Sequence, residues 1–547
     1  MTYNPKYLLA LTALLTVGTL AGCSAVAATT ATTQTAATVA TVTDSSATIA
    51  DVLADNQDWE EDAATAATGD ATTIDLDDAT GTVAIDAAGT YVLTGSLDGQ
   101  VVVAAGEDDD VYLVLDDATI ASTTTAALAI TSAGSVVLEL SGSSELSDAS
   151  SYAEDADVAA ALYSAADLTI TGDGSLTVTG NGADGISARD GLVIESGTLT
   201  VTAADDAIIG KDYIVVENAT LDLTAVGDGL TSSNDTDADR GYVLITGGTV
   251  DISAGADGVQ AETDLLIADG SVTVTATEKG LKAGAFLVVE GGSIAVESTD
   301  DSVHSNGVVH LSGGTLTVAT GDDGVHADGA ILLDGATLDV TESYEGIEAA
   351  VIEISAGEVS VHSSDDGLNA GDGTEAMAAV DGVSLTISGG TVTVDADGDG
   401  LDSNGTATIT GGTTVVAGPT NSGNGALDVN GSFTISGGTL VALGSAGMAV
   451  SPGADSAQSF VATTSVSGSA GDTVEIVDAD GSVIATLEAT KQFGSVVYSS
   501  SEITGGASYT VTVNGSAAAT VTAGEALAGG MGGGQPGGQQ GGGPGRP

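Results

Sequence analysis

Short apolar stretches alternate with polar residues over most of the chain, and the pattern recurs at a nearly fixed interval. Between residues 296 and 360, three successive repeats read VESTDDSVHSNGVVHLSGGTLT, VATGDDGVHADGAILLDGATLD and VTESYEGIEAAVIEISAGEVS. Each has a Gly-Gly-like turn, an alternating stretch such as Thr-Leu-Thr-Val, one or two acidic residues, and a glycine followed by an apolar residue, which we call the Gly step. A fixed period of about 20 to 50 residues is typical of a solenoid.

The Gly step recurs through the middle of the chain. Most of its apolar residues follow one another at about the same spacing as these three repeats, whereas two longer intervals, 230–259 and 368–401, hold polar insertions. Beyond Leu401 the spacing becomes irregular, and we expect Met448 to take the next position. The apolar residues of the step are Ile186, Ile208, Leu230, Val259, Leu281, Val303, Val325, Ile347, Leu368, Leu401 and Met448.

Each repeat contains three strand-like pieces separated by tight turns. The first precedes the Gly-Gly-like turn (168–170), the second follows it (176–178), and the third is the Gly step (185–188). Three short strands in about 22 residues form one coil of a right-handed parallel β-helix, whereas a propeller blade needs about 40 residues or more. The nonapeptide motif of a calcium-binding β-roll is absent. Alternation predicts that the apolar residue of the step and the small residue two positions later point inward, with an outward residue between them.

Changes in this pattern divide the all-β chain into six parts. The regular coils need a cap at each end, because an open end of a solenoid would expose its core and unpaired strand edges. The predicted parts are 1–22 (lipoprotein signal peptide), 23–70 (flexible tether rich in Ala, Thr and Asp), 71–165 (N-terminal cap and first irregular coils), 166–454 (regular β-helix coils), 455–527 (β-rich C-terminal cap) and 528–547 (disordered Gly/Gln/Pro tail).

The N-terminus has the features of an export signal. An apolar run over 7–18 follows Lys6 and is too short for a membrane span. The sequence LAGC, which ends at Cys23, resembles a bacterial lipobox. We therefore expect lipidation of Cys23 and a location on the extracellular face of the cell membrane, with an ordinary secretory signal and a secreted protein as the alternative. Cys23 is the only cysteine, so no intrachain disulfide can form.

The charge of the chain excludes one class of partner and points to another. The chain has 77 acidic and 8 basic residues, and a formal net charge of −69. Nucleic-acid binding is excluded because phosphate contacts need a basic face. Acid on this scale repels itself unless cations neutralise it. Since 42% of the residues are apolar and alternate along strands, the chain is expected to fold despite its charge.

The acidic residues recur at one position, directly before the Gly step. Equivalent positions of a β-helix stack about 4.8 Å apart, and two carboxylates at that distance repel by about 3 kcal/mol at an effective dielectric constant of 20. Ca²⁺ accepts six to eight oxygens in flexible geometry and would remove this repulsion. The alternative is that Asp-Gly pairs only form turns. The predicted calcium ligands are Asp184, Asp205, Asp206, Asp228, Asp257, Asp300, Asp301, Asp322, Asp323, Asp365, Asp366 and Asp399.

These repeats resemble a known family. The sequences AADDAIIGKD (203–212), GGTV (247–250), VQAETDL (259–265) and GDDGVHA (321–327) resemble those of the bacterial calcium-binding, carbohydrate-binding β-helix domain. The resemblance covers about residues 72–527. It implies a fold similar to that of pectate-lyase-type polysaccharide lyases, Ca²⁺ bound along the helix, and binding of cellulose or an acidic, pectin-type glycan of plant walls. The chain departs from the family pattern at Ala207, Lys279 and Ser302.

Three functions follow from these observations. The first is a monomeric cell-surface lipoprotein that binds polysaccharide without catalysis. The second is a calcium-dependent polysaccharide lyase, for which Arg189 and Lys211, followed by Asp190 and Asp212, form the best basic constellation; a salt-bridged pair is the favoured interpretation of these residues. The third is a structural adhesin or spacer. The outward residues of the Gly step are polar and varied, and the predicted carbohydrate-binding residues among them are Gln260, Lys282, His304, His326 and Asn369.

Overall fold

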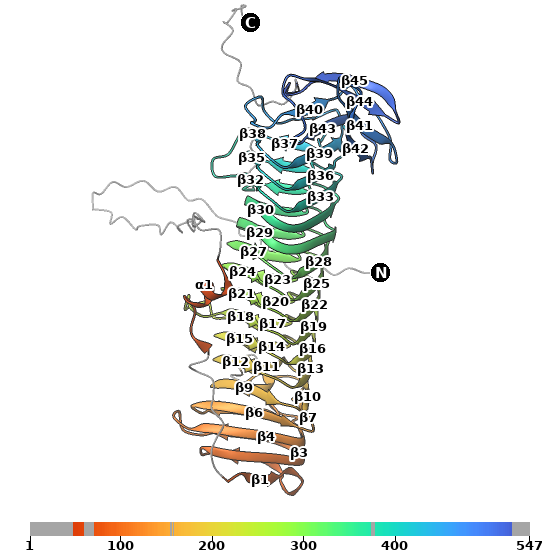
Figure 1. The fold of residues 1–547 in the computed structure, drawn as a ribbon. Coiled ribbons are helices and arrows are strands. Elements are labelled where there is room, and N and C mark those ends of the chain that lie inside the picture. The colour runs from red at the N-terminus through yellow and green to blue at the C-terminus, as the bar shows by residue number, and fades with distance from the viewer. Residues whose placement is uncertain (1–46, 60–69, 154–155, 157, 374–377, 528–547) are drawn as a thin grey trace, which may run out of the picture. The chain divides into compact units, whose positions relative to one another are not determined.

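The chain forms a parallel β-solenoid with about 22 residues per turn, together with a small antiparallel sheet. Figure 1 shows its strands stacked as successive rungs from β1 (Thr72–Asp75) to β39 (Thr439–Gly444). The predicted all-β fold is therefore confirmed. The computed structural model describes residues 47–59, 70–153, 156, 158–373 and 378–527, which all belong to one compact unit. No helix in the described part of the chain is long and apolar enough to cross a membrane.

The strands form three columns, one for each strand-like piece of the repeat. In every column a strand pairs in parallel with the equivalent strand of the next coil, so that His304, for example, lies opposite His326. The first column, which precedes the Gly-Gly-like turn, holds β1, β6 (Ser135–Ser141), β9 (Asp167–Gly172), β12 (Gly191–Ile194), β15 (Tyr213–Val216), β18 (Tyr242–Ile245), β21 (Leu265–Ile267), β24 (Phe286–Val289), β27 (Val308–Leu311), β32 (Ser384–Ile387), β35 (Thr406–Ile409) and β38 (Phe433–Ile435).

The second column follows the turn and the third contains the Gly step. The second column holds β7 (Ser143–Ser147), β10 (Ser175–Gly180), β13 (Thr198–Ala203), β16 (Thr220–Ala225), β19 (Thr249–Ala254), β22 (Ser271–Ala276), β25 (Ser293–Ser298), β28 (Thr315–Thr320), β33 (Thr391–Ala396), β36 (Thr413–Ala417) and β39. The third column holds β2 (Gly81–Ile85), β5 (Leu128–Ser132), β8 (Ala160–Ser164), β11 (Asp184–Ala188), β14 (Ile208–Gly210), β17 (Leu230–Ser232), β20 (Val259–Ala261), β23 (Leu281–Ala283), β26 (Val303–Ser305), β31 (Leu368–Ala370), β34 (Leu401–Ser403) and β37 (Leu427–Val429).

A few elements depart from this plan. A short 3-10 helix, η1 (Leu76–Asp78), follows β1, and four long strands cross between columns. Beyond β39, strand β43 (Ser495–Ser499) pairs antiparallel with it and with β40 (Phe460–Thr463). The long strands are β3 (Gly89–Ala104), β4 (Asp110–Ala121), β29 (Val325–Glu342) and β30 (Ile347–Ser363). The small antiparallel sheet has the order β42 (Val483–Glu488), β41 (Thr473–Val477), β44 (Ser508–Val513) and β45 (Ser516–Thr522).

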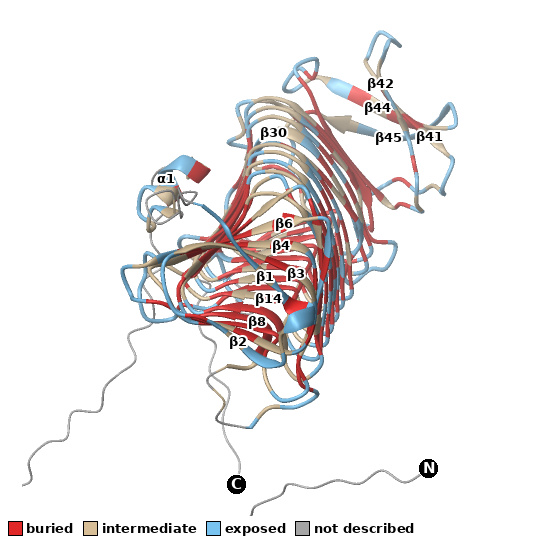
Figure 2. Cartoon of the chain, turned by 90° about the horizontal axis from the view of Figure 1, so that it is seen from below, coloured by how far each residue is buried: buried red, intermediate tan, exposed pale blue. Residues whose placement is uncertain are grey.

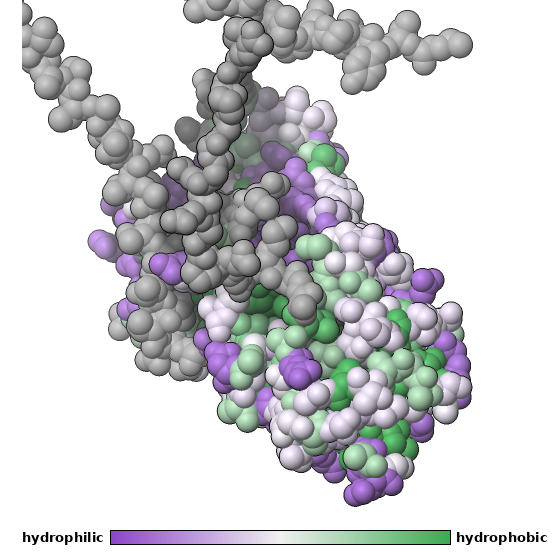
Figure 3. Space-filling model, turned by 90° about the horizontal axis from the view of Figure 1, so that it is seen from above, coloured by the Kyte–Doolittle hydropathy of each residue, from purple (hydrophilic) through white to green (hydrophobic). Residues whose placement is uncertain are grey.

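The core fills the inside of the coils as the alternation predicts. In the second column, β22 exposes Ser271, Thr273 and Thr275 and buries the residues between them. In the third column, Leu281 is fully buried and Ala283, two residues later, is buried beside it. Figure 2 shows buried residues along the strands and exposed residues mainly at the turns. At the C-terminal end, seen from above in Figure 3, apolar residues lie in small patches among polar ones.

The glycine of the Gly step is required by close packing between coils. At Gly346 a Cβ atom would lie 2.2 Å from Val361 Cγ1 and 2.4 Å from the carbonyl oxygen of Gly367 in the next coil. Positive φ angles occur instead at the Gly-Gly-like turns, as at Gly412 (φ +74°). The Asp-Gly pairs are therefore more than turn formers. A branched side chain and a carbonyl oxygen of the next coil also approach Gly185, Gly229, Gly258, Gly280, Gly324, Gly367 and Gly400.

One position of the Gly step was predicted wrongly. Leu427, and not Met448, lies opposite Leu401 in the third column. Met448 lies outside the strands and 43% of its surface is exposed. Alternation does not reveal this coil, because Gly425 stands at the acidic position and Ala426 at the glycine position. With both marker residues replaced, the repeat is visible only from the strand pairing.

Part of the predicted tether is folded. Residues 47–59 contain helix α1 (Ile49–Leu53), whose N-terminus is closed by a capping box between Thr48 and Asp51. Ile49 and Val52 are buried in an apolar cluster on the first column. The first column therefore carries apolar residues on its outward face as well, which alternation alone does not predict. The outward residues of this cluster are Val193, Tyr213, Val215, Tyr242, Leu244, Leu266 and Val288.

Hydrogen bonds fix the same segment to several coils. The amide of Ile49 donates to Glu290 Oε1 (2.8 Å), and Asn56 Nδ2 donates to Asp264 Oδ2 (2.9 Å). His310 Nδ1 lies 2.9 Å from the carbonyl oxygen of Ala47. We refer to residues 47–59 as the N-terminal strap. Residue 70, the last of the predicted tether, is also described. The rest of the tether (23–46 and 60–69), the predicted signal peptide and the predicted tail lie outside the described residues.

The substitution Val52→Asp is expected to release the strap and leave the coils folded. A buried carboxylate without a partner disfavours docking, so we expect a loss of about 1–2 kcal/mol in the free energy of unfolding. Trp59, the only tryptophan, is half-buried against the same apolar cluster. Its fluorescence should shift to the red while the far-ultraviolet circular dichroism is unchanged. Ala50→Asp, on the exposed side of α1, is the matched control; an equal red shift in both variants would contradict this prediction.

Candidate functional site

The acidic residues before the Gly step form a ladder in which six carboxylates accept a hydrogen bond from a backbone amide of the next coil. Asp206 Oδ1, for example, accepts from the amide of Asp228, which stands at the same position one coil later. The carboxylate thus binds an amide at the turn where no strand partner is available, which explains why an acid recurs there. The donor–acceptor distances are 2.7 Å for Asp228 on Asp206, 2.8 Å for Asp257 on Asp228, 2.9 Å for Lys279 on Asp257, 3.3 Å for Asp323 on Asp301, 2.6 Å for Asp399 on Asp366 and 2.5 Å for Gly425 on Asp399.

Burial makes most of these carboxylates difficult to ionise. Burial, and then the neighbouring carboxylates Asp206 and Asp205, raises the pKa of Asp184 to about 7. Burial, and then other acids of the ladder, also raises the pKa of Asp366 and of Asp399 to about 7, although an amide hydrogen bond to each opposes the shift. A row of such groups takes up protons at neutral pH or is neutralised by cations.

At one coil the chain itself supplies the cation. Lys279 stands at the acidic position, and its Nζ lies 2.6 Å from Asp301 Oδ2 and 3.1 Å from Asp300 Oδ1. Lys282, on the third column, places its Nζ 2.7 Å from Asp257 Oδ2. Although burial opposes it, the carboxylates of Asp301 and Asp300 raise the pKa of Lys279. Lys279 is therefore protonated at neutral pH.

The substitution Lys279→Met is expected to make this coil depend on added cations. Removing one partner of a buried ion pair costs about 3 kcal/mol, because the carboxylates of Asp300 and Asp301 stay buried without compensation. Thermal unfolding should show a lower midpoint in chelator and a larger gain on adding Ca²⁺ than the unaltered protein shows. Lys282→Met, whose lysine is more exposed and contacts one carboxylate, should lose about 1 kcal/mol. An equal loss in chelator and in Ca²⁺ for Lys279→Met would contradict the prediction.

The five predicted carbohydrate-binding residues lie in one row on the outward side of the third column. Strand pairing places each beside the next, with Glu348 between the last two. The row continues into two further acids beyond the predicted residues, and most of its side chains are half-buried. Burial, and then its acidic neighbours, raises the pKa of Asp402 to about 8. The complete row reads Gln260, Lys282, His304, His326, Glu348, Asn369, Asp402 and Asp428.

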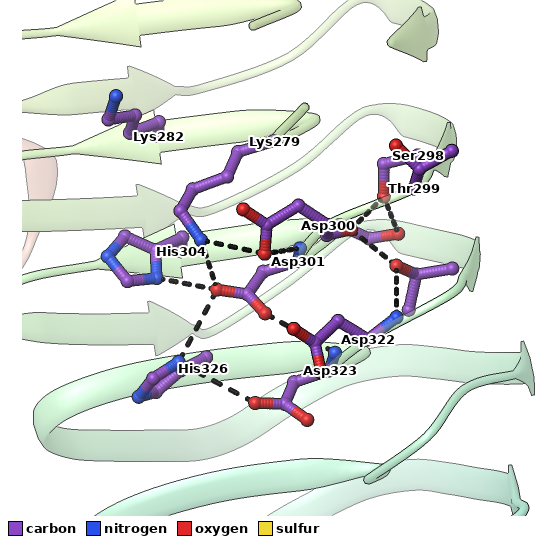
Figure 4. Close-up of polar contacts among 12 residues, drawn as sticks. Lys279, Lys282, Ser298, Thr299, Asp300, Asp301, His304, Asp322, Asp323 and His326 are labelled. Atoms are coloured by element: carbon purple, nitrogen blue, oxygen red, sulfur yellow. Dashed lines mark hydrogen bonds and ion pairs between the residues drawn. The ribbon is translucent and has the colours of Figure 1, made fainter. Parts of the chain in front are cut away.

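The acidic ladder and the polar row meet around Asp301. Figure 4 shows the carboxylate of Asp301 at the centre of a cluster, with the two imidazole rings on one side and Asp300 and Asp322 on the other. Asp301 Oδ2 lies 2.9 Å from His304 Nδ1 and 3.4 Å from His326 Nδ1. Although burial opposes it, the hydrogen bonds from both histidines and Lys279 hold the pKa of Asp301 well below its usual range.

Three groups among the described residues bring potential metal-ligand atoms within 4.8 Å of one another. An all-oxygen group of Asp300, Asp301 and Asp322 fits Ca²⁺, which prefers carboxylate oxygens. The structure does not place the ladder acids of the other described coils in such groups. Glu348 is absent from the predicted ligands. It was missed because it stands in the polar row, whereas the prediction considered only acids before the Gly step. The two remaining groups are Asp301 with His304 and His326, and Asp323 with His326 and Glu348.

One acid of the group considered for lyase chemistry has partners that the repeat does not predict. Asp212, which follows Lys211 in the sequence, is buried and ion-paired with Arg240. Asn234 Nδ2 also donates to Asp212 Oδ1, at 2.6 Å. Both partners come from the longer coil at 230–259, whose insertion brings them to this carboxylate. The regular spacing of the repeat gives no signal for a contact made by an insertion.

Comparisons with known proteins found a matching family model, a similar curated protein and a similar solved structure. Residues 79–324 match the family model described as "Carbohydrate-binding domain-containing protein". A curated protein of the same description from Acetivibrio thermocellus is 38% identical over 128 residues, or 22% of this chain. The match spans 45% of that relative, less than half of its length.

A solved structure is also similar to this chain. Its title is "Structure of the polysaccharide lyase-like protein from C. thermocellum, Gadolinium derivative", and it is 25% identical with a TM-score of 0.35. The alignment covers 49% of this chain and 98% of that one. Residues 79–324, somewhat less than half of this chain, are thus similar to the carbohydrate-binding domain family.

Proposed function

We propose that this protein binds polysaccharide at the cell surface through its β-solenoid, that Ca²⁺ stabilises the solenoid, and that binding involves no catalysis. The observation that carries the proposal is the polar row of the third column, most of whose predicted residues lie inside the segment that matches the carbohydrate-binding family. Rigid strands hold its amide, ammonium and imidazole groups about 4.8 Å apart. Such a row can form hydrogen bonds along an extended glycan chain.

The proposed calcium site is the all-oxygen group of carboxylates. The carboxylates of Asp300, Asp301 and Asp322 come from two adjacent coils, so one ion would hold the coils together and remove their repulsion. A cation held there can also be shared with the carboxylates of an acidic glycan. A pectin-type uronan or cellulose is therefore the proposed ligand, the first with Ca²⁺ as a bridge and the second by hydrogen bonding alone.

A non-catalytic role is favoured by the ion pairs of Lys279 and Lys282, the two lysines of the acidic ladder and the polar row. β-Elimination of a uronate needs an unprotonated base, and Lys279 is held protonated by two carboxylates. Lys282 is engaged by Asp257. Lipid attachment at Cys23 and a location on the extracellular face of the membrane complete the proposal. They rest on the LAGC sequence, which lies outside the described residues.

Affinity electrophoresis tests this proposal. The chain from Ser24 onward should be retarded in gels that contain polygalacturonate and Ca²⁺, and not in the same gels with chelator. The double variant Gln260→Ala/Asn369→Ala should weaken the retardation at least about tenfold in apparent Kd, which corresponds to about 1.4 kcal/mol. Thr273→Ala, on the exposed side of the second column, is the control.

Other outcomes of that experiment discriminate between functions. Retardation by a soluble cellulose derivative that chelator does not change would identify a neutral glucan as the ligand. Ultraviolet absorbance of unsaturated products would show a lyase and overturn the non-catalytic role. A folded protein that none of these gels retards would contradict carbohydrate binding and favour a structural spacer.

A further inference from the structure

Two histidines from adjacent coils lie edge to edge beside a buried carboxylate. His304 of β26 lies opposite His326 of β29, with ring centroids 5.0 Å apart and an interplanar angle of 89°. Asp301, from the turn before β26, directs Oδ2 to the Nδ1 atoms of both rings, as Figure 4 shows. Strand pairing therefore fixes three metal-ligating side chains around one point.

Both ring nitrogens of His304 have an oxygen partner. Its Nε2 lies 3.0 Å from Asn306 Oδ1, and its Nδ1 lies 2.9 Å from Asp301 Oδ2. A neutral imidazole has a single N–H and cannot donate to both oxygens. In the tautomer with the proton on Nε2, that nitrogen donates to Asn306 Oδ1 and the Nδ1 lone pair is free to bind a metal ion shared with Asp301 Oδ2. An oxygen that accepts from the far nitrogen is also how metal-binding histidines are oriented in proteins.

The distances match a small four-coordinate ion. Bonds of about 2.0–2.1 Å in a tetrahedral site place neighbouring ligand atoms about 3.3 Å apart. The two Asp301–histidine distances are 2.9 and 3.4 Å, and Asp323 Oδ2 lies 3.6 Å from His326 Nδ1. The group of Asp323, His326 and Glu348 adjoins the first through the shared His326. A fourth ligand is thus available from Asp323 or Glu348.

We propose that His304, His326 and Asp301, with Asp323 or Glu348, form a site for a borderline transition-metal ion of the Zn²⁺ class. Two imidazole nitrogens with carboxylate oxygens suit Zn²⁺, Co²⁺ or Ni²⁺, whereas Ca²⁺ and Mg²⁺ take oxygen ligands. The site is separate in chemistry from the oxygen group of Asp300, Asp301 and Asp322, although Asp301 belongs to both. It stands independently of carbohydrate binding.

Lys279 acts as a built-in competitor at this site. Its Nζ shares Asp301 Oδ2 with the two histidines, and it keeps a second partner, Asp300 Oδ1, at 3.1 Å. Metal binding at Asp301 would therefore shift Lys279 toward Asp300 without leaving the ammonium group unpaired. Removing the lysine charge should strengthen metal binding, since two cations compete for one carboxylate oxygen.

Isothermal titration of the chain with ZnCl₂, in a buffer with millimolar Ca²⁺ to saturate oxygen-only sites, tests the proposal. We expect one Zn²⁺ per chain, at least about 100-fold weaker binding in His304→Gln and in His326→Gln, and about tenfold tighter binding in Lys279→Met. His362→Gln is the matched control, because His362 is exposed and the chain has only four histidines. Co²⁺ should give a visible absorption spectrum of four-coordinate type that both site variants lose.

Circular dichroism of each variant before titration separates loss of ligand from loss of fold. No Zn²⁺ binding by the folded, unaltered chain would overturn the proposal. So would binding that survives in folded His304→Gln and His326→Gln, since that result assigns the heat to oxygen ligands. Carbohydrate retardation in the gels is a separate readout, so failure of one proposal does not decide the other.

Discussion

In the presence of chelator, this protein is expected to lose stability as the pH rises from about 5 to about 9, by on the order of 10 °C in Tm. The cause is the set of buried carboxyls with raised pKa values, among them Asp184, Asp366 and Asp399 at about 7 and Asp402 at about 8. In the unfolded chain an Asp carboxyl has a pKa of about 3.9. Between that value and the folded value the native state binds more protons than the unfolded state, so the free energy of unfolding falls as the pH rises.

Ca²⁺ is expected to remove most of this dependence, because an ion bound by the ionised carboxylates stabilises the folded state that holds them together. The measurement is thermal unfolding by circular dichroism over this pH range, in chelator and in millimolar Ca²⁺. Parallel curves in the two buffers would mean that the ladder does not bind the ion. A chelated protein that becomes more stable as the pH rises would contradict the buried, proton-binding state of these carboxyls.

A single substitution isolates the effect. Asp402→Asn keeps the shape of the side chain and removes the charge from a group buried among Asp366, Asp399 and Asp428. At pH 9 without Ca²⁺ it should raise the free energy of unfolding by on the order of 2 kcal/mol, and at pH 5 the gain should be clearly smaller, because folded Asp402 is then protonated and only the ionised unfolded form opposes folding. Asp222→Asn, on the exposed side of β16, should be neutral at both pH values.

Gly346→Val is expected to cost more than about 3 kcal/mol and to shift the urea midpoint accordingly. Even a Cβ atom at this position would overlap the side chain of Val361 and the carbonyl oxygen of Gly367, and two further methyl groups add to the overlap. Because each coil contacts its neighbours on both sides, strain at one coil spreads through the stacking on either side of it.

Ala207→Ser is the matched control for that substitution. Ala207 stands at the glycine position of another coil. Ser302 stands at the same position of a third coil and shows that a serine is accepted there, since its hydroxyl donates to the carbonyl oxygen of Ala319. We expect Ala207→Ser to cost less than about 1 kcal/mol. If Gly346→Val were as stable as the unaltered chain, the close approach between coils would not be the reason for the glycine.

Periodicity predicts this fold well, because a solenoid repeats one local pattern and each coil contacts only its neighbours. The inward residues Leu281 and Ala283, for example, follow directly from the two-residue alternation of a strand. The wrong assignment of Met448 shows the limit of that reasoning. Leu427 is identified by its pairing with Leu401 alone, since Gly425 replaces the acid and Ala426 replaces the glycine of the Gly step.

The candidate site is predicted less completely than the fold, since it depends on contacts between coils. The positions of the ladder acids follow from the repeat, and the row from Gln260 to Asn369 follows from the outward residue of the Gly step. The hydrogen bond from the amide of Asp228 to Asp206 could not be predicted, because it depends on how the turns of adjacent coils stack. Arg240 reaches Asp212 from an insertion, and no spacing rule describes an insertion.

The N-terminal strap imposes an order on folding. Its residues leave the ribosome and any export channel before the coils on which they dock, because the partners of Ile49 and Ala47 are Glu290 and His310, far along the chain. Contacts of such sequence separation close late, because the intervening chain must be ordered before they form. A nascent chain that has not reached the coil of β24 therefore lacks part of the apolar surface on which this segment docks, and leaves the apolar side of the segment available to a chaperone.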